Sequence, residues 1–167
     1  IGRSFQEAFL KAWASLEYGP PHPRPLSMAD ISEGEGMGDR ASEPLPDETL
    51  EEWLRVATDR RMGALYEAFR RGWSIDRVEG ITSITRWFLH KFERMALVDA
   101  EVVEARNSGK ADSITHEMMR HWKSNGLTDA HIADAMAGYP TTGWRIKDSG
   151  LTEFDVMSRR HELNIHP

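Results

Sequence analysis

Two histidines in the last third of the chain could hold a metal ion only if their rings shared one face of a helix. Helical zinc motifs place the paired histidines four residues apart, so that both rings project toward the same ion. His116 and His121 are separated by five positions, and at 3.6 residues per turn their directions differ by about 140°. The spacing therefore predicts solvated histidines, and we expect no metal-binding residues.

A glycine-rich stretch at residues 34–38, GEGMG, could be compared with a phosphate-binding loop. Such loops follow a strand and open a helix, so that backbone N–H groups point at the anion. This stretch follows no strand pattern and opens no helical pattern, and the carboxylate of Glu35 would repel a phosphate. It is predicted to be a flexible loop, and we expect no cofactor-binding residues.

The acidic residues of the stretch 47–52 could be imagined as a cation site. They stand at the start of a predicted helix, where the helix dipole favours carboxylates without any bound ion. The chain also has seven histidines among many serines and aspartates, so no Ser-His-Asp arrangement can be singled out from spacing. We therefore expect no catalytic residue.

A helix-turn-helix outline spans residues 128–137 and 152–163. Arg159, Arg160 and His161 would lie on its second helix, which in such proteins enters the major groove. The connection is much longer than the usual three or four residues, and the chain has a formal net charge of −6, whereas DNA-binding domains are usually basic. A free-standing DNA-binding regulator is the alternative function; we expect no nucleic-acid partner.

An apolar stripe on the first predicted helix is a candidate association surface. Phe9, Trp13 and Leu16 follow one another at three- and four-residue steps, so they share one helical face. If the rest of the chain does not cover this face, it is available to a partner. The tryptophans Trp53, Trp87 and Trp122 lie among helical apolar positions and are predicted to be core residues.

Helical periodicity accounts for most of the chain, and no segment shows the alternation of a strand. Ser4, Ser74, Thr128 and Thr152 are placed to cap helices. Further helices are predicted over 59–71, 85–106 and 114–124, with another beginning at Asp47, and a local turn over 26–31. The fold class is therefore all-α, with about seven or eight helices.

Two small helical clusters are predicted within one domain of residues 1–167, the first over about 1–106 and the second over about 113–167. Each contains a helix, a glycine, a capping Ser or Thr, and another helix, at Gly72-Trp73-Ser74 and Gly126-Leu127-Thr128. Residues 20–46 are rich in Pro and Gly and are predicted to form a long, partly disordered loop. Residues 139–150 are predicted to form a second loop.

Composition narrows the class of protein further. The chain has 167 residues and no cysteine, which excludes disulfides and thiolate metal sites. It contains no apolar run of the roughly 20 residues that span a membrane, so no membrane partner is expected. No secretory signal is visible, which favours a cytoplasmic location, with mitochondria as the alternative. The first residue is Ile1 rather than Met, which favours a piece of a longer polypeptide.

Five ordered segments resemble the oligomerisation domain of the carbamoyl-phosphate synthetase large chain. They are IGRSFQEAFLKAWASLE at 1–17, DRRMGALYEAFRRGWS at 59–74, ITRWFLHKFERM at 84–95, GLTDAHIA at 126–133 and LNIHP at 163–167. The Trp-Phe-Leu string is the most distinctive of these. The sequence departs from the family at Thr85, where an Asp is usual, and in the loop 20–46 and the apparent insertion 139–150.

The resemblance implies a non-catalytic helical domain between the two ATP-grasp halves of a glutamine-dependent synthetase. The parent chain would be an ATP-dependent ligase that makes carbamoyl phosphate for pyrimidine or arginine biosynthesis. ATP with magnesium or manganese would bind in the ATP-grasp halves, outside this domain. The implied partners are those flanking halves, other copies of the large chain, and the glutamine amidotransferase subunit or domain.

Overall fold

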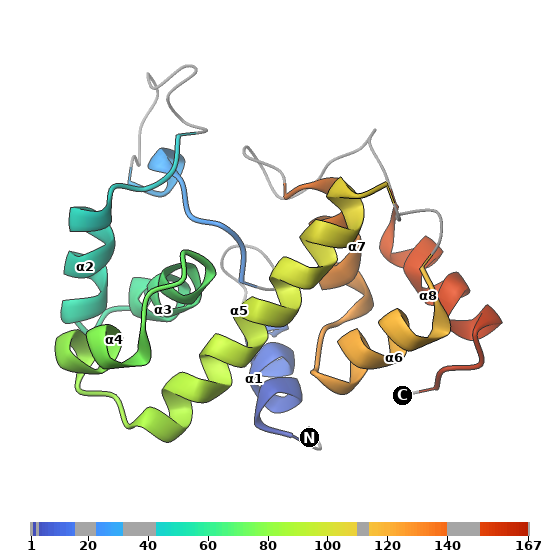
Figure 1. The fold of residues 1–167 in the computed structure, drawn as a ribbon, viewed down its shortest axis with the longest axis horizontal. Helices are drawn as coiled ribbons and strands as arrows, with labels where there is room; N and C mark the ends of the chain where they lie inside the picture. Colours follow the sequence, from blue (N-terminus) through green and yellow to red (C-terminus); the bar gives the residue numbers. More distant parts are fainter. Residues whose placement is uncertain are drawn as a thin grey trace. The chain divides into compact units, whose positions relative to one another are not determined.

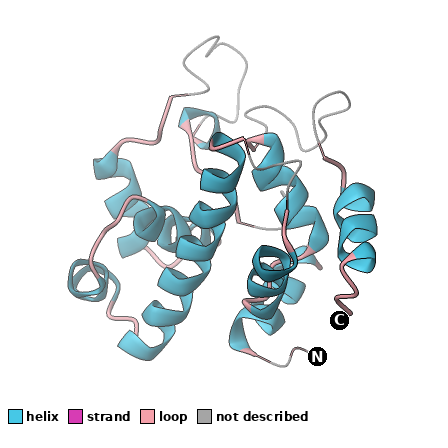
Figure 2. Cartoon of the chain, turned by 45° about the vertical axis from the view of Figure 1, so that its right-hand side comes forward, coloured by secondary structure: helices cyan, strands magenta, loops and turns pink. Residues whose placement is uncertain are grey.

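The computed structural model describes residues 2, 4–15, 23–31, 43–109, 114–139 and 151–166. Within these ranges the chain is helical and contains no strand, which confirms the all-α prediction (Figure 2). The helices, labelled in Figure 1, are α1 (Phe5–Ala14), α2 (Asp47–Arg55), α3 (Arg60–Arg70), α4 (Ile75–Thr82), α5 (Arg86–Asn107), α6 (His116–Ser124), α7 (Asp129–Ala137) and α8 (Glu153–Glu162), with a 3₁₀-helix at Met28–Asp30.

Side-chain caps determine where most of these helices begin. The hydroxyl oxygens of Ser4, Ser74, Thr128 and Thr152 each accept a hydrogen bond from the backbone N–H three residues later. Each cap satisfies one of the N–H groups that a helix start leaves without an internal partner. These four helix starts lie where the sequence predicted them.

The predicted loops are described in part. The turn expected over 26–31 is the 3₁₀-helix, and Ser27 forms an isolated antiparallel bridge with Pro44. Residues 20–22 and 32–42 of the first predicted loop, and 140–150 of the second, lie outside the described residues.

Contacts divide the described residues into two compact units. Unit 1 contains those within 1–22, 97–140 and 144–167, and unit 2 contains those within 23–96. Helix α5 contributes its first half to unit 2 and its second half to unit 1. This division places α1 with the C-terminal helices, whereas the sequence-based grouping placed it with the first cluster.

Unit 2 is built around α3, in which every residue from Ala64 to Phe69 is buried. Aliphatic and aromatic side chains of α2, α4 and the first half of α5 complete this core. They are Leu50, Leu54, Val78, Leu89, Phe92 and Met95.

One buried carboxylate in unit 2 connects α3 to the segment before the 3₁₀-helix. The Glu67 side chain is 4% exposed and accepts hydrogen bonds from Arg70 Nε at 3.1 Å and Arg71 Nε at 2.7 Å. It also accepts from the backbone N–H of Leu26 at 3.3 Å. A buried charge is tolerated only when it is paired and hydrogen-bonded, and Glu67 meets both conditions.

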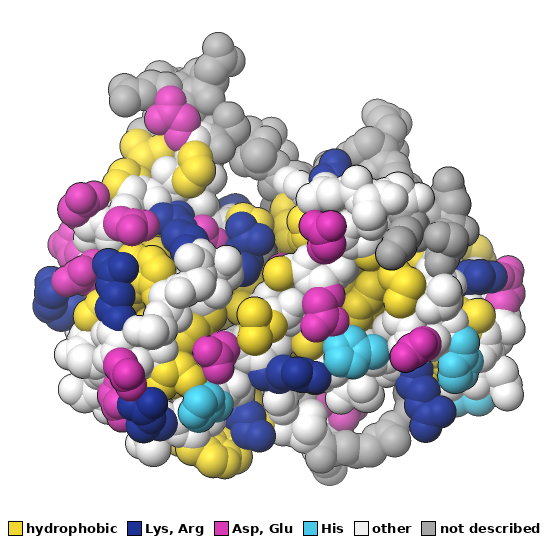
Figure 3. Space-filling model, in the orientation of Figure 1, with side chains coloured by type: hydrophobic (Ala, Val, Ile, Leu, Met, Phe, Trp, Pro, Cys, Tyr) yellow, Lys and Arg dark blue, Asp and Glu magenta, His cyan; other side chains and the backbone are white. Residues whose placement is uncertain are grey.

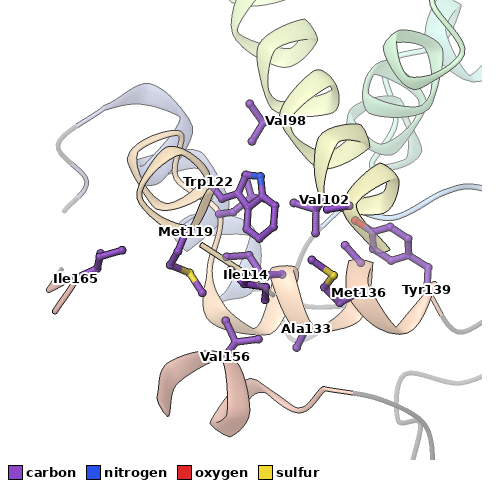
Figure 4. Close-up of a cluster of buried hydrophobic side chains, with 14 residues drawn as sticks. Val98, Val102, Ile114, Met119, Trp122, Ala133, Met136, Tyr139, Val156 and Ile165 are labelled. Atoms are coloured by element: carbon purple, nitrogen blue, oxygen red, sulfur yellow. The ribbon is translucent and has the colours of Figure 1, made fainter. Parts of the chain in front are cut away.

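Unit 1 has a second hydrophobic core, shown in Figure 4. The Trp122 ring from α6 is 2% exposed and lies near Val98 and Val102 of α5. Helices α7 and α8 add Ala133, Met136 and Val156. The burial of Trp122 confirms its predicted place in the core.

The repeated helix–glycine–cap motif is present in both units. At the first copy Gly72 has φ 76° and the Trp73 N–H donates to the Ala68 carbonyl; at the second, Gly126 has φ 93° and Leu127 donates to Trp122. A positive φ and a six-residue return bond are the features of a Schellman helix end. Because each glycine is followed two residues later by a cap, only four residues separate the end of one helix from the start of the next.

Candidate functional site

The predicted association stripe on α1 is partly covered by the rest of the protein. Phe9 and Trp13 are both of intermediate exposure, and Leu16 lies outside the described residues. Their rings form a continuous row, with centroids 5.8 Å apart between Phe5 and Phe9 and 5.7 Å apart between Phe9 and Trp13. The described part of this stripe therefore contributes to packing as well as to the surface.

A second aromatic pair is far more exposed, at the start of α5. Trp87 is 54% exposed and Phe88 is 43% exposed. Their ring centroids lie 4.8 Å apart with an interplanar angle of 88°, which is the edge-to-face geometry that aromatic pairs prefer. The prediction that Trp87 is a core residue is wrong.

The helical period explains this error. The buried face of the first half of α5 carries Leu89, Phe92 and Met95, at steps of three. Trp87 and Phe88 precede Leu89 directly, and at 100° per residue they point about 200° and 100° away from it. Three consecutive apolar residues span about 200° of a helix surface, so a helix buried on one side cannot cover all three. This was the signal that could have identified the pair.

Charged side chains of both signs lie at the start of α5, which also carries the aromatic pair. Arg86 Nη1 lies 2.6 Å from Asp76 Oδ1 and 2.7 Å from Glu79 Oε2 of α4. Donating hydrogen bonds to Asp76 and then Glu79 raises the pKa of the Arg86 guanidinium above its ordinary value. The Lys91 ammonium lies 5.0 Å from the centroid of the Trp87 ring, within reach of a cation–π interaction.

Figure 3 shows hydrophobic side chains near the N-terminal end of α5, beside Lys or Arg and His side chains.

Unit 1 contains a hollow of about 640 Å³ lined by α1, α6, α8 and the start of α7. Its cations are largely engaged within the protein: Lys11 binds Glu7 at 2.7 Å, and Lys123 and Arg160 bind the two oxygens of Asp129 at 2.8 and 3.1 Å. Asp129 thereby links α6, α7 and α8. This arrangement is first of all a structural ion network.

A buried Asp–His–Tyr cluster also lies in unit 1. Asp99 Oδ1 accepts a hydrogen bond from the Tyr139 hydroxyl and lies 3.0 Å from His131 Nε2. Asp99 and His131 are 0% exposed and Tyr139 is 8% exposed. These residue types occur in acid–base catalysis, but a general base must reach a substrate proton, and these groups are enclosed by the core. The cluster ties α5 to α7.

The histidines and acidic residues considered above as possible metal or cation ligands do not come together in one site. His121 Nε2 lies 2.9 Å from Glu101 Oε2, and His116 is exposed. Among the described residues no three His, Asp or Glu side chains are placed to hold a metal ion. Residues 34–38 lie outside the described ranges. At the start of α2, Asp47 pairs with Arg71 at 2.8 Å and Glu51 pairs with Arg55 at 2.7 Å.

The structure does not favour the DNA-binding alternative. Arg160, which would face DNA, is 6% exposed and bonds Asp129 and the Ile165 carbonyl. Arg159 donates to the Ile114 carbonyl and to Glu162. Two of the three proposed DNA contacts are thus used to hold α8 in unit 1. In the part of the chain described, no helix is both long enough and apolar enough to cross a membrane.

Comparison with known proteins identifies the family. The model of the carbamoyl-phosphate synthetase large chain oligomerisation domain matches residues 1–164. The large-chain N-terminal section from Aquifex aeolicus is 34% identical over all of this chain, which covers 24% of that relative. The arginine-specific, mitochondrial large chain from Schizosaccharomyces pombe is 34% identical, and the Vibrio cholerae large chain is 27% identical; this chain aligns in full with each and covers 12% and 13% of them. The chain therefore belongs to the oligomerisation-domain family of the carbamoyl-phosphate synthetase large chain.

Proposed function

We propose that this domain is a non-catalytic module that joins two ATP-grasp halves of a synthetase large chain and takes part in association between large chains. One observation carries the proposal: the chain aligns over its whole length with large chains of which it makes up only 12% or 13%. The folded domain suits such a role. Each unit has its own hydrophobic core and its own ion network, at Glu67 in unit 2 and at Asp129 in unit 1. These features favour a rigid unit that can act as a spacer.

The parent polypeptide would be an ATP-dependent ligase that forms carbamoyl phosphate. ATP and magnesium or manganese would bind in its ATP-grasp halves, and a glutamine amidotransferase would supply ammonia. A defined separation between the two halves would help an unstable intermediate pass from one active site to the other. The cytoplasm is the proposed location, with mitochondria as the alternative.

Carbamoyl phosphate from this parent would serve pyrimidine or arginine biosynthesis. One relative is named as arginine-specific, which supports the arginine route for at least part of the family. Deleting the parent gene in its host separates the two routes. A requirement for arginine alone, for uracil alone, or for both would assign the pathway directly.

The mass of the native polypeptide tests the linking role. We expect the intact chain to be many times the 19.0 kDa of this domain, with ATP-grasp peptides on both its N-terminal and C-terminal sides. Intact-mass measurement followed by peptide mapping provides this result. A native chain close to 19.0 kDa would end the proposal that the domain links two halves.

A further inference from the structure

We infer that Asp99 and His131 form a buried carboxylate–imidazolium pair, which holds α7 against α5 and weakens when His131 loses its proton at alkaline pH. Both residues lie in unit 1. The pair makes the contact between two helices of one unit sensitive to pH, and this property is independent of the proposed linking role.

Hydrogen-bond geometry places a proton on Nε2 of His131. This nitrogen lies 3.0 Å from Asp99 Oδ1 and 3.1 Å from the hydroxyl oxygen of Tyr139. The Tyr139 hydroxyl donates its own hydrogen to Asp99 Oδ1, so Nε2 needs a hydrogen to bond with either oxygen. Two forms of the ring satisfy this condition, the neutral Nε2–H tautomer and the imidazolium.

Burial favours the imidazolium over the neutral tautomer. The side chains of His131 and Asp99 are 1% and 0% exposed, and a carboxylate removed from water is costly unless an opposite charge pairs with it. Among the described residues, Asp99 bonds to His131 and Tyr139 alone. Of these two side chains, only His131 can carry a positive charge. His131 therefore supplies the counter-charge that Asp99 requires.

The other charged side chains on the helices of unit 1 are paired elsewhere or lie nearer the surface. Lys123 of α6 and Arg160 of α8 both pair with Asp129. The remaining groups in the described part of unit 1 are Glu7 paired with Lys11 in α1, Glu101 paired with His121, the exposed Arg106 of α5, the partly exposed Asp134 of α7 and the exposed Glu153 of α8. These cations therefore do not balance the charge of Asp99.

The direction of the pH effect follows from this charge balance. Burial alone lowers the pKa of a histidine, but the adjacent carboxylate raises it, because deprotonation would leave Asp99 without a counter-charge. The ordinary pKa of histidine is about 6.5. The pair therefore stabilises the folded chain fully below about pH 6.5, and this stabilisation is lost as the pH rises through the folded-state pKa of His131.

Nitrogen NMR of the histidine rings tests the charge without any substitution. Ring nitrogen shifts distinguish an imidazolium from either neutral tautomer. At about pH 7.5 an ordinary histidine is mostly neutral, whereas we expect both ring nitrogens of His131 to remain protonated. A neutral His131 ring at this pH would overturn the inference.

Urea denaturation of matched variants tests the consequence for stability. His131→Gln keeps an N–H donor but cannot take up a proton. Between about pH 6 and 9 the unfolding equilibrium constant should rise at least tenfold more in the native chain than in His131→Gln, since a pKa raised by one unit corresponds to a factor of ten. Tyr139→Phe is the matched control. It deletes a hydrogen bond to the same carboxylate but leaves the charge pair, so it should keep the native pH dependence.

Hydrogen exchange locates the effect in the structure. Protection factors of α7 amides, corrected for the intrinsic pH dependence of exchange, should fall at least tenfold between about pH 6 and 9 in the native chain. They should change much less in His131→Gln. Equal changes in the two proteins would overturn the control of α7 by this pair. None of these results affects the mass of the native polypeptide, which decides the linking role separately.

Discussion

Gly72 and Gly126 can be compared directly, because both end a helix with a positive φ and both are followed by a capped helix. They differ in their surroundings. A Cβ at position 72 would meet nothing within 4 Å, whereas one at position 126 would lie 2.7 Å from the backbone nitrogen of Glu7. Position 126 therefore requires glycine for both its backbone conformation and the close approach of α1.

Gly126→Ala should destabilise the protein much more than Gly72→Ala. The left-handed conformation costs alanine about 1 kcal/mol at either site. At position 126 the collision with the α1 backbone adds about 1 to 3 kcal/mol, as overpacking does in other cores. Urea denaturation of the two variants measures the difference. Equal losses of unfolding free energy would mean that α1 can move away from residue 126 at little cost.

The capping residue Thr152 lowers the pKa of the Asp155 carboxyl. The Asp155 carboxylate accepts hydrogen bonds from the Thr152 hydroxyl at 2.6 Å and from its backbone N–H at 2.8 Å, and these bonds lower the pKa of Asp155. A lowered pKa in the folded state stabilises the protein above the ordinary carboxyl range. That stabilisation is lost as the pH falls through the folded-state pKa.

Thr152→Ala should therefore raise the pKa of Asp155 toward its ordinary value, while Thr152→Ser, which keeps a hydroxyl, should leave it low. The side-chain hydrogen bond is the larger of the two causes, so the hydroxyl decides the outcome. Carboxyl carbon shifts recorded by NMR between about pH 2 and 6 give both pKa values. Identical titration curves for the two variants would contradict the role given to the hydroxyl.

Helix α3 carries a buried acid, Glu67, that holds a neighbouring segment of the chain. Glu67→Gln keeps the shape of the side chain but removes the charge that binds Arg70 and Arg71. Breaking a buried ion pair costs about 3 kcal/mol, so we expect a loss of that order in the free energy of unfolding. Faster hydrogen exchange at the Leu26 amide should accompany it, because that N–H donates to Glu67.

Glu51→Gln is the matched control for Glu67→Gln. It removes the same charge from an ion pair with Arg55, but the Glu51 side chain is 35% exposed. Exposed pairs of this type contribute less than about 1 kcal/mol. A comparable loss in both variants would show that total charge, rather than the buried network, determines the effect.

Helix positions could be predicted from the sequence because their starts are encoded locally. Ser74 and Thr128 stand immediately before helices whose first turns they cap, and glycines mark the ends before them. Trp87 was wrongly predicted to be buried because α5 has 22 residues, and apolar residues on several of its faces make the buried face ambiguous. A strict test of the helical period would have resolved it.

Long-range pairs could not be predicted in the same way. Asp99 lies 32 residues from His131 and 40 from Tyr139, and no local spacing relates them. The bond between Leu26 and Glu67 spans 41 residues. Such pairs form only when the helices pack, so the ion networks that hold each unit together became visible only in the structure.

In the whole domain, α5 belongs to both compact units. Leu89, Phe92 and Met95 are buried in unit 2, and Val98 and Val102 belong to the core of unit 1. One continuous helix therefore carries parts of both cores. Partial unfolding of either unit would expose apolar residues on this helix, so we expect the native domain to unfold in one cooperative transition.

Breaking α5 between the two cores should remove this cooperativity. Ala100 is exposed, so Ala100→Pro removes a helix hydrogen bond and clashes with the preceding turn, at a cost of about 3 kcal/mol, without creating a core cavity. Ala100→Ser changes the same exposed position but leaves the helix intact. Hydrogen exchange followed during denaturation, at amides of α3 for unit 2 and of α7 for unit 1, should give coincident midpoints for the native chain and Ala100→Ser, and separate midpoints for Ala100→Pro. Coincident midpoints in all three proteins would show that the units are coupled by something other than the continuity of α5.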